Sequence, residues 1–396
     1  MNVLFIAPLK DIKAKDGGYG TASESLHYVF SLLKKEKKII EYDTVNIFDF
    51  KNSRFDRNKH YDVAIVITNP NTFLNHGMKE TFENLLKNCK RKYLNILWET
   101  IPLPKKWSFL WESDLFDGFV APSYFLLAQL SKVTKKELFY LPYYVSDSIE
   151  KINIKEKLKE ELFTVLMMGQ NTTRKGLDDG IIAYCRMFNS IKNAQLIVKS
   201  HTLGDEQSIS KKIKYLATHN MSCKNAPVFL LENELTKNQI FELYTSCSVL
   251  LFSSRGEGFG LPPAEAMSVG LPVIYTNWSS LPEVCDSMYN IAVPYYLDEA
   301  VNMFEYGYEI GSKYAIPSIG ETMRALYLTY RMWQDRREKY YTNAQNNIEI
   351  IKSRFGLDAI KNYILNILQN KKSDLNNQYF EDTVKQYDLV MGVDKK

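Results

Sequence analysis

Two carboxylates and a run of glycines occur together in the segment SSRGEGFGLPPAEAM, residues 253–267. Glu257 and Glu265 lie eight positions apart. An ionised carboxylate accepts two hydroxyl hydrogens at once, which suits the neighbouring hydroxyls of a sugar or a ribose. Gly258 and Gly260 stand between them and allow tight turns and close approach of a ligand to the backbone. The segment therefore predicts a binding site for a polyhydroxylated ligand.

The elements predicted on either side of this segment would orient its backbone N–H groups towards a bound anion. The apolar run Val249–Phe252 just before it indicates a buried strand, and Pro262 and Pro263 fit the first turn of a helix. A strand, a glycine loop and a helix start in this order present backbone N–H groups to a ligand, as a diphosphate requires. The alternative is a capped helix in which Glu265 only compensates the helix dipole. We prefer that alternative for Glu265 taken alone, but not for the whole segment.

Short apolar runs alternate with helical patterns along the chain, which indicates βαβ units and parallel sheets. In the first part of the chain we expect strands at Val3–Ala7, Val63–Thr68, Tyr93–Trp98, Phe119–Pro122 and Leu138–Leu141. A second series is expected at Phe163–Met168, Leu196–Lys199, Val228–Leu231, Val249–Phe252 and Val273–Tyr275. The α/β chain thus divides into two Rossmann-like domains, 1–145 and 162–344, joined by a charged linker, 146–161. Ligands are expected at the carboxyl ends of both sheets.

The last part of the chain has a different pattern. Apolar residues recur at helical spacing over residues 345–370, which predicts a helix there. Residues 371–396 are polar and are expected to form a tail or a short exposed helix.

Composition excludes several classes of protein. A net charge of +4, from 50 basic and 46 acidic residues, predicts no nucleic-acid partner, although a weak contact with anionic membranes stays compatible with it. Five scattered cysteines indicate free thiols in a reducing compartment. No run approaches the roughly 20 apolar residues of a membrane span, and the opening apolar run reads as a strand rather than a signal peptide. We expect a soluble cytoplasmic protein with at most peripheral contact at a membrane surface.

The segment GEGFGLPPAEAMSVGLPVI closely resembles the signature of family-four glycosyltransferases, which are retaining enzymes with the GT-B fold. The resemblance extends to MGQNTTRKGL at 168–177, which is similar to the family's phosphate-binding loop, to LPEV at 281–284, and to WETIPLPKKW at 98–107. It implies two Rossmann-like parallel-sheet domains that face a cleft, the donor bound mainly by the second and the acceptor by the first. The helix at 345–370 would then cross back to pack on the first domain.

The resemblance also assigns roles by motif position. Glu257 would contact the donor sugar, Glu265 the ribose, and Lys175 would supply the cation of the phosphate loop. Taken alone, Lys175 would be interpreted as a solvated lysine at the start of a helix. Its place beside Gly176 in the matching loop favours the interpretation as a phosphate-binding cation instead. The implied catalytic residues are Glu257, Lys175 and Glu99. The implied donor-binding residues are Gly18, Gly169, Arg174, Lys175, Glu257, Gly258, Phe259, Gly260, Leu261 and Glu265.

Neither a metal nor a cofactor is expected. The sequence has no Asp-x-Asp that could bridge a diphosphate through a divalent cation, and no HExxH or paired cysteines. In enzymes of this fold a lysine and a helix dipole take the place of the metal.

Two positions depart from the family pattern. Gln170 follows Gly169 where the family usually has an arginine, so Arg174 or Arg255 would have to replace that cation. Glu99 stands at the end of the expected strand 93–98, where many relatives carry a histidine, and its triplet Trp-Glu-Thr resembles one branch of the family. A carboxylate there could accept hydrogen bonds from sugar hydroxyls or orient the acceptor. The alternative is a surface glutamate at a strand exit.

The resemblance therefore implies a retaining glycosyltransferase that moves a hexose from a UDP- or GDP-sugar to a glycan, lipid-linked or protein acceptor. The departing diphosphate oxygen would deprotonate the acceptor hydroxyl. Two alternatives stay open. Gln170 is compatible with a nucleotide-sugar-binding subunit without catalysis. A nucleotide-sugar epimerase of the same fold is the other, although we see no distinct acid–base pair for it.

Overall fold

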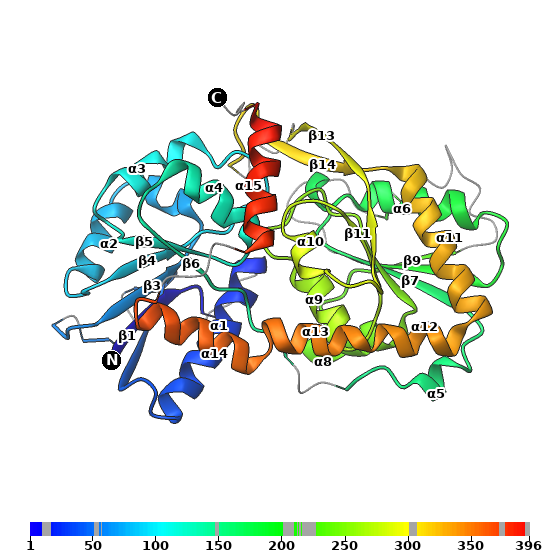
Figure 1. The fold of residues 1–396 in the computed structure, drawn as a ribbon, viewed down its shortest axis with the longest axis horizontal. Helices are drawn as coiled ribbons and strands as arrows, with labels where there is room; N and C mark the ends of the chain where they lie inside the picture. Colours follow the sequence, from blue (N-terminus) through cyan, green and yellow to red (C-terminus); the bar gives the residue numbers. More distant parts are fainter. Residues whose placement is uncertain are drawn as a thin grey trace. The chain divides into compact units, whose positions relative to one another are not determined.

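The computed structural model of the chain describes residues 1–9, 17–50, 55, 56, 58–146, 150–200, 210, 211, 213, 215, 227–300, 307–371 and 377–392. The chain forms two compact units (Figure 1). The first comprises Met1–Val145, Tyr306–Ser312 and Arg354–Lys396, and the second comprises Ser146–Glu305 and Lys313–Ser353. A short segment late in the sequence, Tyr306–Ser312, therefore belongs to the first unit although both of its neighbours belong to the second.

The first unit is built on a parallel sheet of six strands in the order β2-β1-β3-β4-β5-β6. The strands are β1 (Asn2–Ala7), β2 (Glu41–Asn46), β3 (Val63–Ile67), β4 (Lys92–Asn95), β5 (Gly118–Ala121) and β6 (Glu137–Tyr140). The central strand β3 is buried along its whole length, as its unbroken apolar sequence requires. The edge strand β2 was not predicted, because its sequence EYDTVN has only two apolar residues, Tyr42 and Val45, and they are three positions apart and so do not show the alternation of a half-buried strand.

Helices and short 3-10 turns cover this sheet. They are α1 (Gly17–Lys35), η1 (Pro70–Leu74), α2 (Met78–Leu86), η2 (Lys105–Trp107), α3 (Ser108–Glu112), α4 (Tyr124–Val133), α14 (Leu357–Leu368) and α15 (Gln378–Met391). Gly17, Gly18 and Gly20 follow the first strand in the sequence and lie in the first turn of α1, not in a loop.

The last two helices of the chain, α14 and α15, belong to the first unit. The expected single helix over 345–370 is two helices, α13 (Asn346–Phe355) and α14, because the chain is extended at Gly356. The Arg91 guanidinium donates to the last carbonyls of α14, with 2.6 Å to the oxygen of Leu368. Within the stretch expected to be a tail or a short exposed helix, the helix α15 packs against α4 (Figure 1), where Lys132 forms an ion pair of 2.5 Å with Asp388.

The second unit repeats the design. Its parallel sheet has the order β12-β11-β10-β7-β8-β9. The strands are β7 (Phe163–Met168), β8 (Ala194–Lys199), β9 (Val228–Leu231), β10 (Val249–Phe252), β11 (Val273–Thr276) and β12 (Ile291–Val293), and an antiparallel pair is formed by β13 (Tyr295–Glu299) and β14 (Lys313–Pro317). The remaining elements are α5 (Ile154–Lys157), η3 (Thr173–Lys175), α6 (Leu177–Phe188), α8 (Lys237–Ser246), α9 (Leu261–Ser268), α10 (Leu281–Val284), α11 (Ile319–Asp335) and α12 (Arg337–Ala344).

Strand β7 is the topological switch point of the second sheet. The next strand in the sequence, β8, lies on one side of β7, and β10, the third strand after β7, lies on the other. In open parallel sheets, ligands bind beyond the carboxyl ends of the two strands at such a point. The loops that follow β7 and β10 are therefore the first place to look for a site.

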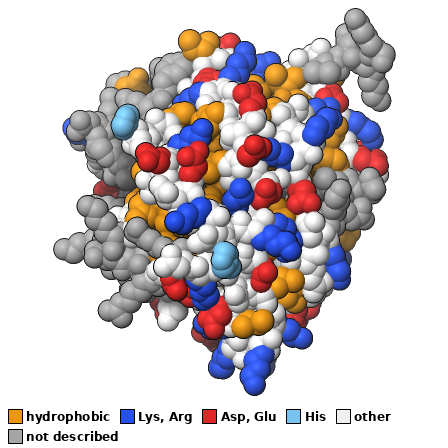
Figure 2. Space-filling model, turned by 90° about the vertical axis from the view of Figure 1, so that its left-hand side faces the viewer, with side chains coloured by type: hydrophobic (Ala, Val, Ile, Leu, Met, Phe, Trp, Pro, Cys, Tyr) orange, Lys and Arg blue, Asp and Glu red, His pale blue; other side chains and the backbone are white. Residues whose placement is uncertain are grey.

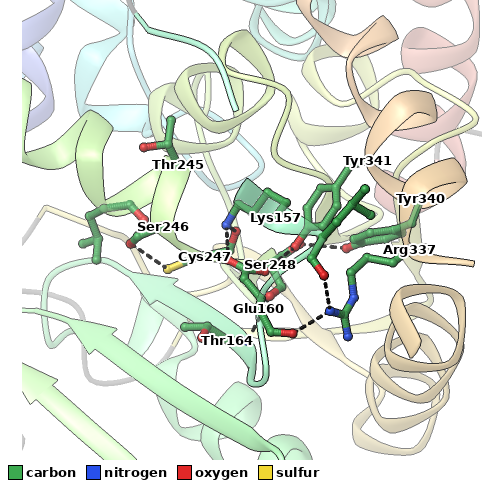
Figure 3. Close-up of polar contacts among 12 residues, drawn as sticks. Lys157, Glu160, Thr164, Thr245, Ser246, Cys247, Ser248, Arg337, Tyr340 and Tyr341 are labelled. Atoms are coloured by element: carbon green, nitrogen blue, oxygen red, sulfur yellow. Dashed lines mark hydrogen bonds and ion pairs between the residues drawn. The ribbon is translucent and has the colours of Figure 1, made fainter. Parts of the chain in front are cut away.

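A buried polar cluster fastens α5 to α12 in the second unit (Figure 3). The Lys157 ammonium, 4% exposed, donates to Glu160 Oε1 at 2.6 Å and to the carbonyl of Cys247 at 2.7 Å. The Tyr341 hydroxyl donates to the second oxygen of Glu160 at 2.9 Å. The neighbouring Tyr340 hydroxyl donates to the carbonyl of Ser248 at 2.8 Å. These contacts compensate a lysine whose burial would otherwise cost several kcal/mol.

Replacing Glu160 with alanine is therefore expected to lower the free energy of unfolding by about 3 kcal/mol, because a buried ammonium is left without its counter-ion. Tyr341→Phe removes one hydrogen bond and should cost about 1 kcal/mol. Glu156→Ala is the matched control, since its ion pair with Lys159 is largely exposed and should contribute less than about 0.5 kcal/mol. Urea unfolding followed by circular dichroism measures all three. Equal losses in Glu160→Ala and Glu156→Ala would contradict this role for the cluster.

Charges of both signs are interspersed on the face of the molecule shown in Figure 2. The basic run at residues 34–38 is partly compensated, since Lys34 lies 3.5 Å from Glu41, and Glu36 forms an ion pair with Lys361. Across the described ranges, no helix has both the length and the apolar character needed to cross a membrane.

Candidate functional site

Two loops of the second unit meet at the carboxyl ends of β7 and β10. The loop after β7 contains the short turn η3, and the loop after β10 begins with Ser253. The Ser253 hydroxyl donates to the carbonyl of Gly176 at 2.7 Å, and the N–H of Arg255 donates to the carbonyl of Arg174 at 2.7 Å. These two bonds hold the phosphate-loop motif and the glycine-loop motif of the sequence against each other.

Gly176 is required for this contact. Its φ of +57° lies in the left-handed region, and a Cβ there would come within 2.2 Å of the carbonyl oxygen of Ser253. Any side chain at this position would push the two loops apart. The glycine thus explains why the motif places a small residue directly after Lys175.

The carboxylate of Glu257 lies at the centre of the junction. Its Oε1 accepts from Lys175 Nζ at 2.5 Å and from the Ser254 hydroxyl at 2.6 Å, and lies 3.3 Å from an Arg174 guanidinium nitrogen. Burial by itself would raise the pKa of Glu257, but Lys175, Arg174 and Ser254 outweigh it and hold the pKa below its ordinary value. Glu257 is therefore ionised at neutral pH.

Two serines that follow β11 fix the backbone around Glu257. The N–H of Glu257 donates to the Ser279 hydroxyl at 2.9 Å. The Ser280 hydroxyl lies 3.0 Å from the carbonyl oxygen of Glu257 and 2.8 Å from that of Phe259. Three neighbouring strands of the sheet, β7, β10 and β11, therefore contribute to the position of a single carboxylate.

Two cationic side chains lie at the junction. Lys175 and Arg174 both contact the carboxylate of Glu257, at 2.5 and 3.3 Å. Arg255 has a different partner, because its guanidinium forms two contacts with Asp179 Oδ2, at 2.9 and 2.8 Å, and donates to the Tyr314 hydroxyl. Of the two arginines that could replace the cation missing at Gln170, Arg174 is therefore the one beside Glu257.

The helix α9 begins directly after the glycine loop. Its N-cap is Gly260, with a left-handed φ of +95°, and its first residue is Leu261, followed by prolines. Glu265, which would have to lie in the first turn to compensate the helix dipole, is the fifth residue of α9 and so lies beyond that turn. The Tyr244 hydroxyl donates to Glu265 Oε2 at 3.1 Å. Burial raises the pKa of Glu265 to about 7, and the bond from Tyr244 opposes that rise.

The third predicted catalytic residue, Glu99, lies in the first unit. The strand β4 ends at Asn95, not at Trp98 as predicted, so Glu99 stands four positions beyond the last residue of the strand rather than directly after it. The chain leaves the sheet early because residues 96–98 pack as a buried apolar loop. The Glu99 carboxylate accepts a hydrogen bond of 2.9 Å from the Tyr308 hydroxyl. Gly18, a predicted donor-binding residue, lies in the first turn of α1 of the same unit.

Sequence reasoning missed several residues that build these sites. Ser254 precedes the glycine loop, and Ser279 and Ser280 precede LPEV, so their positions beside known motifs were an available signal. Tyr308 carried no such signal, because it is separated from Glu99 by 209 positions and follows no motif. The described part of the chain contains no group of three or more His, Cys, Asp or Glu that could hold a metal ion.

Residues 148–302 match the model of the family described as glycosyl transferases group 1. A stretch of 150 residues is 28% identical to the serotype-specific mannosyltransferase WbdA of Escherichia coli, covering 37% of this chain and 18% of that protein. This chain thus spans less than a fifth of the length of that curated relative. A shorter stretch of 52 residues is 46% identical to the O-antigen chain mannosyltransferase B of Escherichia coli, covering 13% of this chain and 14% of that protein.

Solved structures share the fold over nearly the whole chain. A glycosyltransferase from Rickettsia africae has a TM-score of 0.64 at 11% identity, over 93% of this chain and 98% of that one. Anabaena Alr3699/HepE, solved in complex with UDP and glucose, has a TM-score of 0.60 at 16% identity, over 93% of this chain and all of that one. The two Rossmann-like units therefore form a GT-B fold, which confirms the predicted fold class.

Proposed function

We propose that this chain, a GT-B protein that carries a glycosyl transferases group 1 domain over residues 148–302, is a retaining glycosyltransferase. It would move a hexose from a nucleotide-diphosphate sugar to a hydroxyl of a glycan, lipid-linked or protein acceptor. One observation carries the proposal: the Glu257 carboxylate is held between Lys175 and Arg174 where the loops after β7 and β10 meet. This junction offers both a carboxylate for sugar hydroxyls and two cationic side chains for a diphosphate.

The proposed reaction needs no nucleophile from the protein. The acceptor oxygen forms a bond to C1 of the donor sugar while the bond from C1 to the diphosphate oxygen breaks, and the acceptor's proton passes to that departing oxygen. Negative charge develops on the diphosphate, where Lys175 and Arg174 stabilise it. Glu257 orients the sugar through its hydroxyls, and the start of α9 presents the backbone of Phe259, Gly260 and Leu261 to the diphosphate. Gly169 and Gly258 keep the two loops close to the ligand.

We infer that the transferred sugar is mannose. The support is the activity of the Escherichia coli relatives, both of which are mannosyltransferases. The identities to the structures solved with UDP are too low to carry a donor from them to this chain. GDP-mannose is therefore the first donor to test, with UDP-glucose as the comparison.

We place the reaction in the cytoplasm, with peripheral contact at a membrane surface if the acceptor is lipid-linked. The four cysteines within the described ranges are all free and buried, which is compatible with a reducing compartment.

Affinity for the donor is expected to rise with pH through about 7, because Glu265 must be ionised to accept the two ribose hydroxyl hydrogens. With the pKa of Glu265 raised to about 7, the ionised fraction falls roughly tenfold between pH 8 and pH 6. Binding that requires the ionised form should weaken by up to about tenfold over that range. Calorimetry with GDP-mannose measures it, since the sugar diphosphate takes up no proton there. Glu265→Gln should bind weakly at both pH values, and a steep pH dependence in that variant would contradict the assignment.

A thermal-shift panel of nucleotide sugars and free nucleoside diphosphates, in EDTA, tests the proposed donor site. A ligand that binds only the folded protein raises its melting temperature as its concentration exceeds its dissociation constant. We expect GDP-mannose and GDP to stabilise the wild type and to stabilise Glu265→Gln less. A chain that no nucleotide sugar stabilises, with or without added Mg²⁺, would overturn the proposal.

A further inference from the structure

A segment between β13 and β14 forms part of the first unit rather than the second. We call its described residues, Gly307–Ser312, the strap. The strands on either side of it pair with each other in the second unit. The strap lies over the region that follows β4, where Glu99 is found.

The strap is fastened by its acidic residue. The Glu309 carboxylate accepts from the backbone N–H groups of Lys105 and Lys106, at 2.8 and 3.1 Å. These two N–H groups lie at the start of the short turn η2 and have no hydrogen-bond partner within the turn. The Glu309 carboxylate supplies the acceptor that they lack. The N–H of Glu309 donates to the Ser312 hydroxyl at 3.2 Å, which closes the strap into a turn.

A glycine lets the strap approach the first unit closely. Gly307 has a φ of +89°, and a Cβ there would come within 2.3 Å of Asn71 Nδ2. Asn71 is itself held, because its Oδ1 accepts from the indole N–H of Trp107 at 2.9 Å. The backbone of the strap therefore contacts a fixed amide, and the close contact depends on the absence of a side chain at position 307.

Tyr308 directs its hydroxyl at the predicted catalytic carboxylate. Its side chain is 5% exposed, its ring packs on that of Trp98 with centroids 4.5 Å apart, and its hydroxyl donates to Glu99 Oε2 at 2.9 Å. Trp98 in turn packs on Trp107 at 4.7 Å. The ring contact and the Glu309 anchor already dock the strap, so docking alone does not require a hydroxyl at this position.

Glu99 keeps access to a ligand while it is held. Its side chain is only partly buried, whereas its neighbours Trp98 and Thr100 are buried. A carboxylate that accepts from Tyr308 through one oxygen still has lone pairs that can accept from a sugar hydroxyl.

We propose that Tyr308 is a positioning residue for this reaction: it fixes the Glu99 carboxylate so that Glu99 can accept a hydrogen bond from a reacting sugar hydroxyl. The strap is then part of the carbohydrate site of the first unit, supplied by a segment from late in the sequence. The inference rests on the proposed glycosyltransferase function and adds the residue that orients its first-unit carboxylate.

A double-mutant cycle tests this inference. The wild type, Tyr308→Phe, Glu99→Gln and the double variant are compared for the rate of nucleoside diphosphate release from GDP-mannose and from UDP-glucose, and for donor affinity by calorimetry. Tyr296→Phe is the matched control, since this tyrosine lies on β13 and is 59% exposed. Melting temperatures confirm that each variant is folded.

We expect Glu99→Gln to lower the release rate at least about tenfold, the modest end for a positioned acid–base group, and Tyr308→Phe to lower it about fivefold. Donor affinity should stay within about twofold in both. The double variant should lose no more than Glu99→Gln alone, because Tyr308 acts through Glu99. Wild-type rates in Tyr308→Phe, or losses that multiply in the double variant, would overturn the inference. A wild type that consumes neither donor would instead overturn the proposed function.

Discussion

Lys175→Ala is expected to lower the rate of sugar transfer by about a thousandfold, while Lys175→Arg retains part of it. A cation placed where charge develops on the leaving diphosphate contributes on the order of 3–4 kcal/mol to the transition state. The structure places Lys175 Nζ 2.5 Å from Glu257, which Arg174 also contacts. An arginine keeps the charge but not the compact shape of the ammonium, so it should restore only part of the rate.

Nucleoside diphosphate release under saturating donor measures this effect. Lys339→Ala serves as the matched control, because this lysine is exposed on α12 and remote in sequence from both loops. Lys175→Ala should also bind GDP more weakly than the wild type. If Lys175→Ala turns over like Lys339→Ala, the cation is not part of the reaction and the proposed mechanism is wrong.

Glu257→Gln is expected to separate binding from turnover. In the structure Glu257 competes with any diphosphate for Lys175 and Arg174. Removal of its charge releases both cations, so free GDP should bind at least as tightly as in the wild type. Turnover of GDP-mannose should nevertheless fall by about a hundredfold or more, because the carboxylate no longer orients the sugar hydroxyls.

The comparison with Glu265→Gln sharpens this prediction, since that variant should lose affinity for GDP. Calorimetry with GDP and steady-state rates with GDP-mannose, measured on both variants, distinguish the two carboxylates. If Glu257→Gln loses GDP affinity and keeps its turnover, the roles of the two carboxylates have been exchanged.

Much of the second unit could be predicted because its strands are unbroken apolar runs. The structure confirms β7, β9 and β10 with the bounds read from the sequence. The motifs around Lys175 and Glu257 follow two of these strands, so their meeting at the carboxyl edge of a parallel sheet followed from the order of elements. The assignment of Arg174 rather than Arg255 to Glu257 could not be predicted, because it depends on the ion pair of Arg255 with Asp179.

What could not be predicted lies mainly in short or half-exposed elements. The edge strand β2 and the antiparallel pair β13–β14 have mixed polar sequences that resemble loops. Since β13 and β14 were missed, the strap between them was missed as well. The contact of Tyr308 with Glu99 joins residues 209 positions apart and leaves no periodic pattern in the sequence. The predicted end of β4 was wrong because the loop that follows the strand is also apolar, so the sequence shows no change where the strand ends.

A retaining glycosyltransferase transfers the sugar of a nucleotide-diphosphate sugar and keeps its anomeric configuration in the product. Proton NMR of GDP-mannose and of UDP-glucose, each followed in EDTA with the purified chain and a mixture of glycan acceptors, measures both the transfer and the configuration. We predict release of the nucleoside diphosphate and a product whose new anomeric signal has the configuration of the donor. A product with inverted anomeric configuration would contradict the proposed retaining mechanism. An isomerised donor sugar without transfer, as an epimerase would form, or binding without consumption of either donor would contradict the proposed transfer.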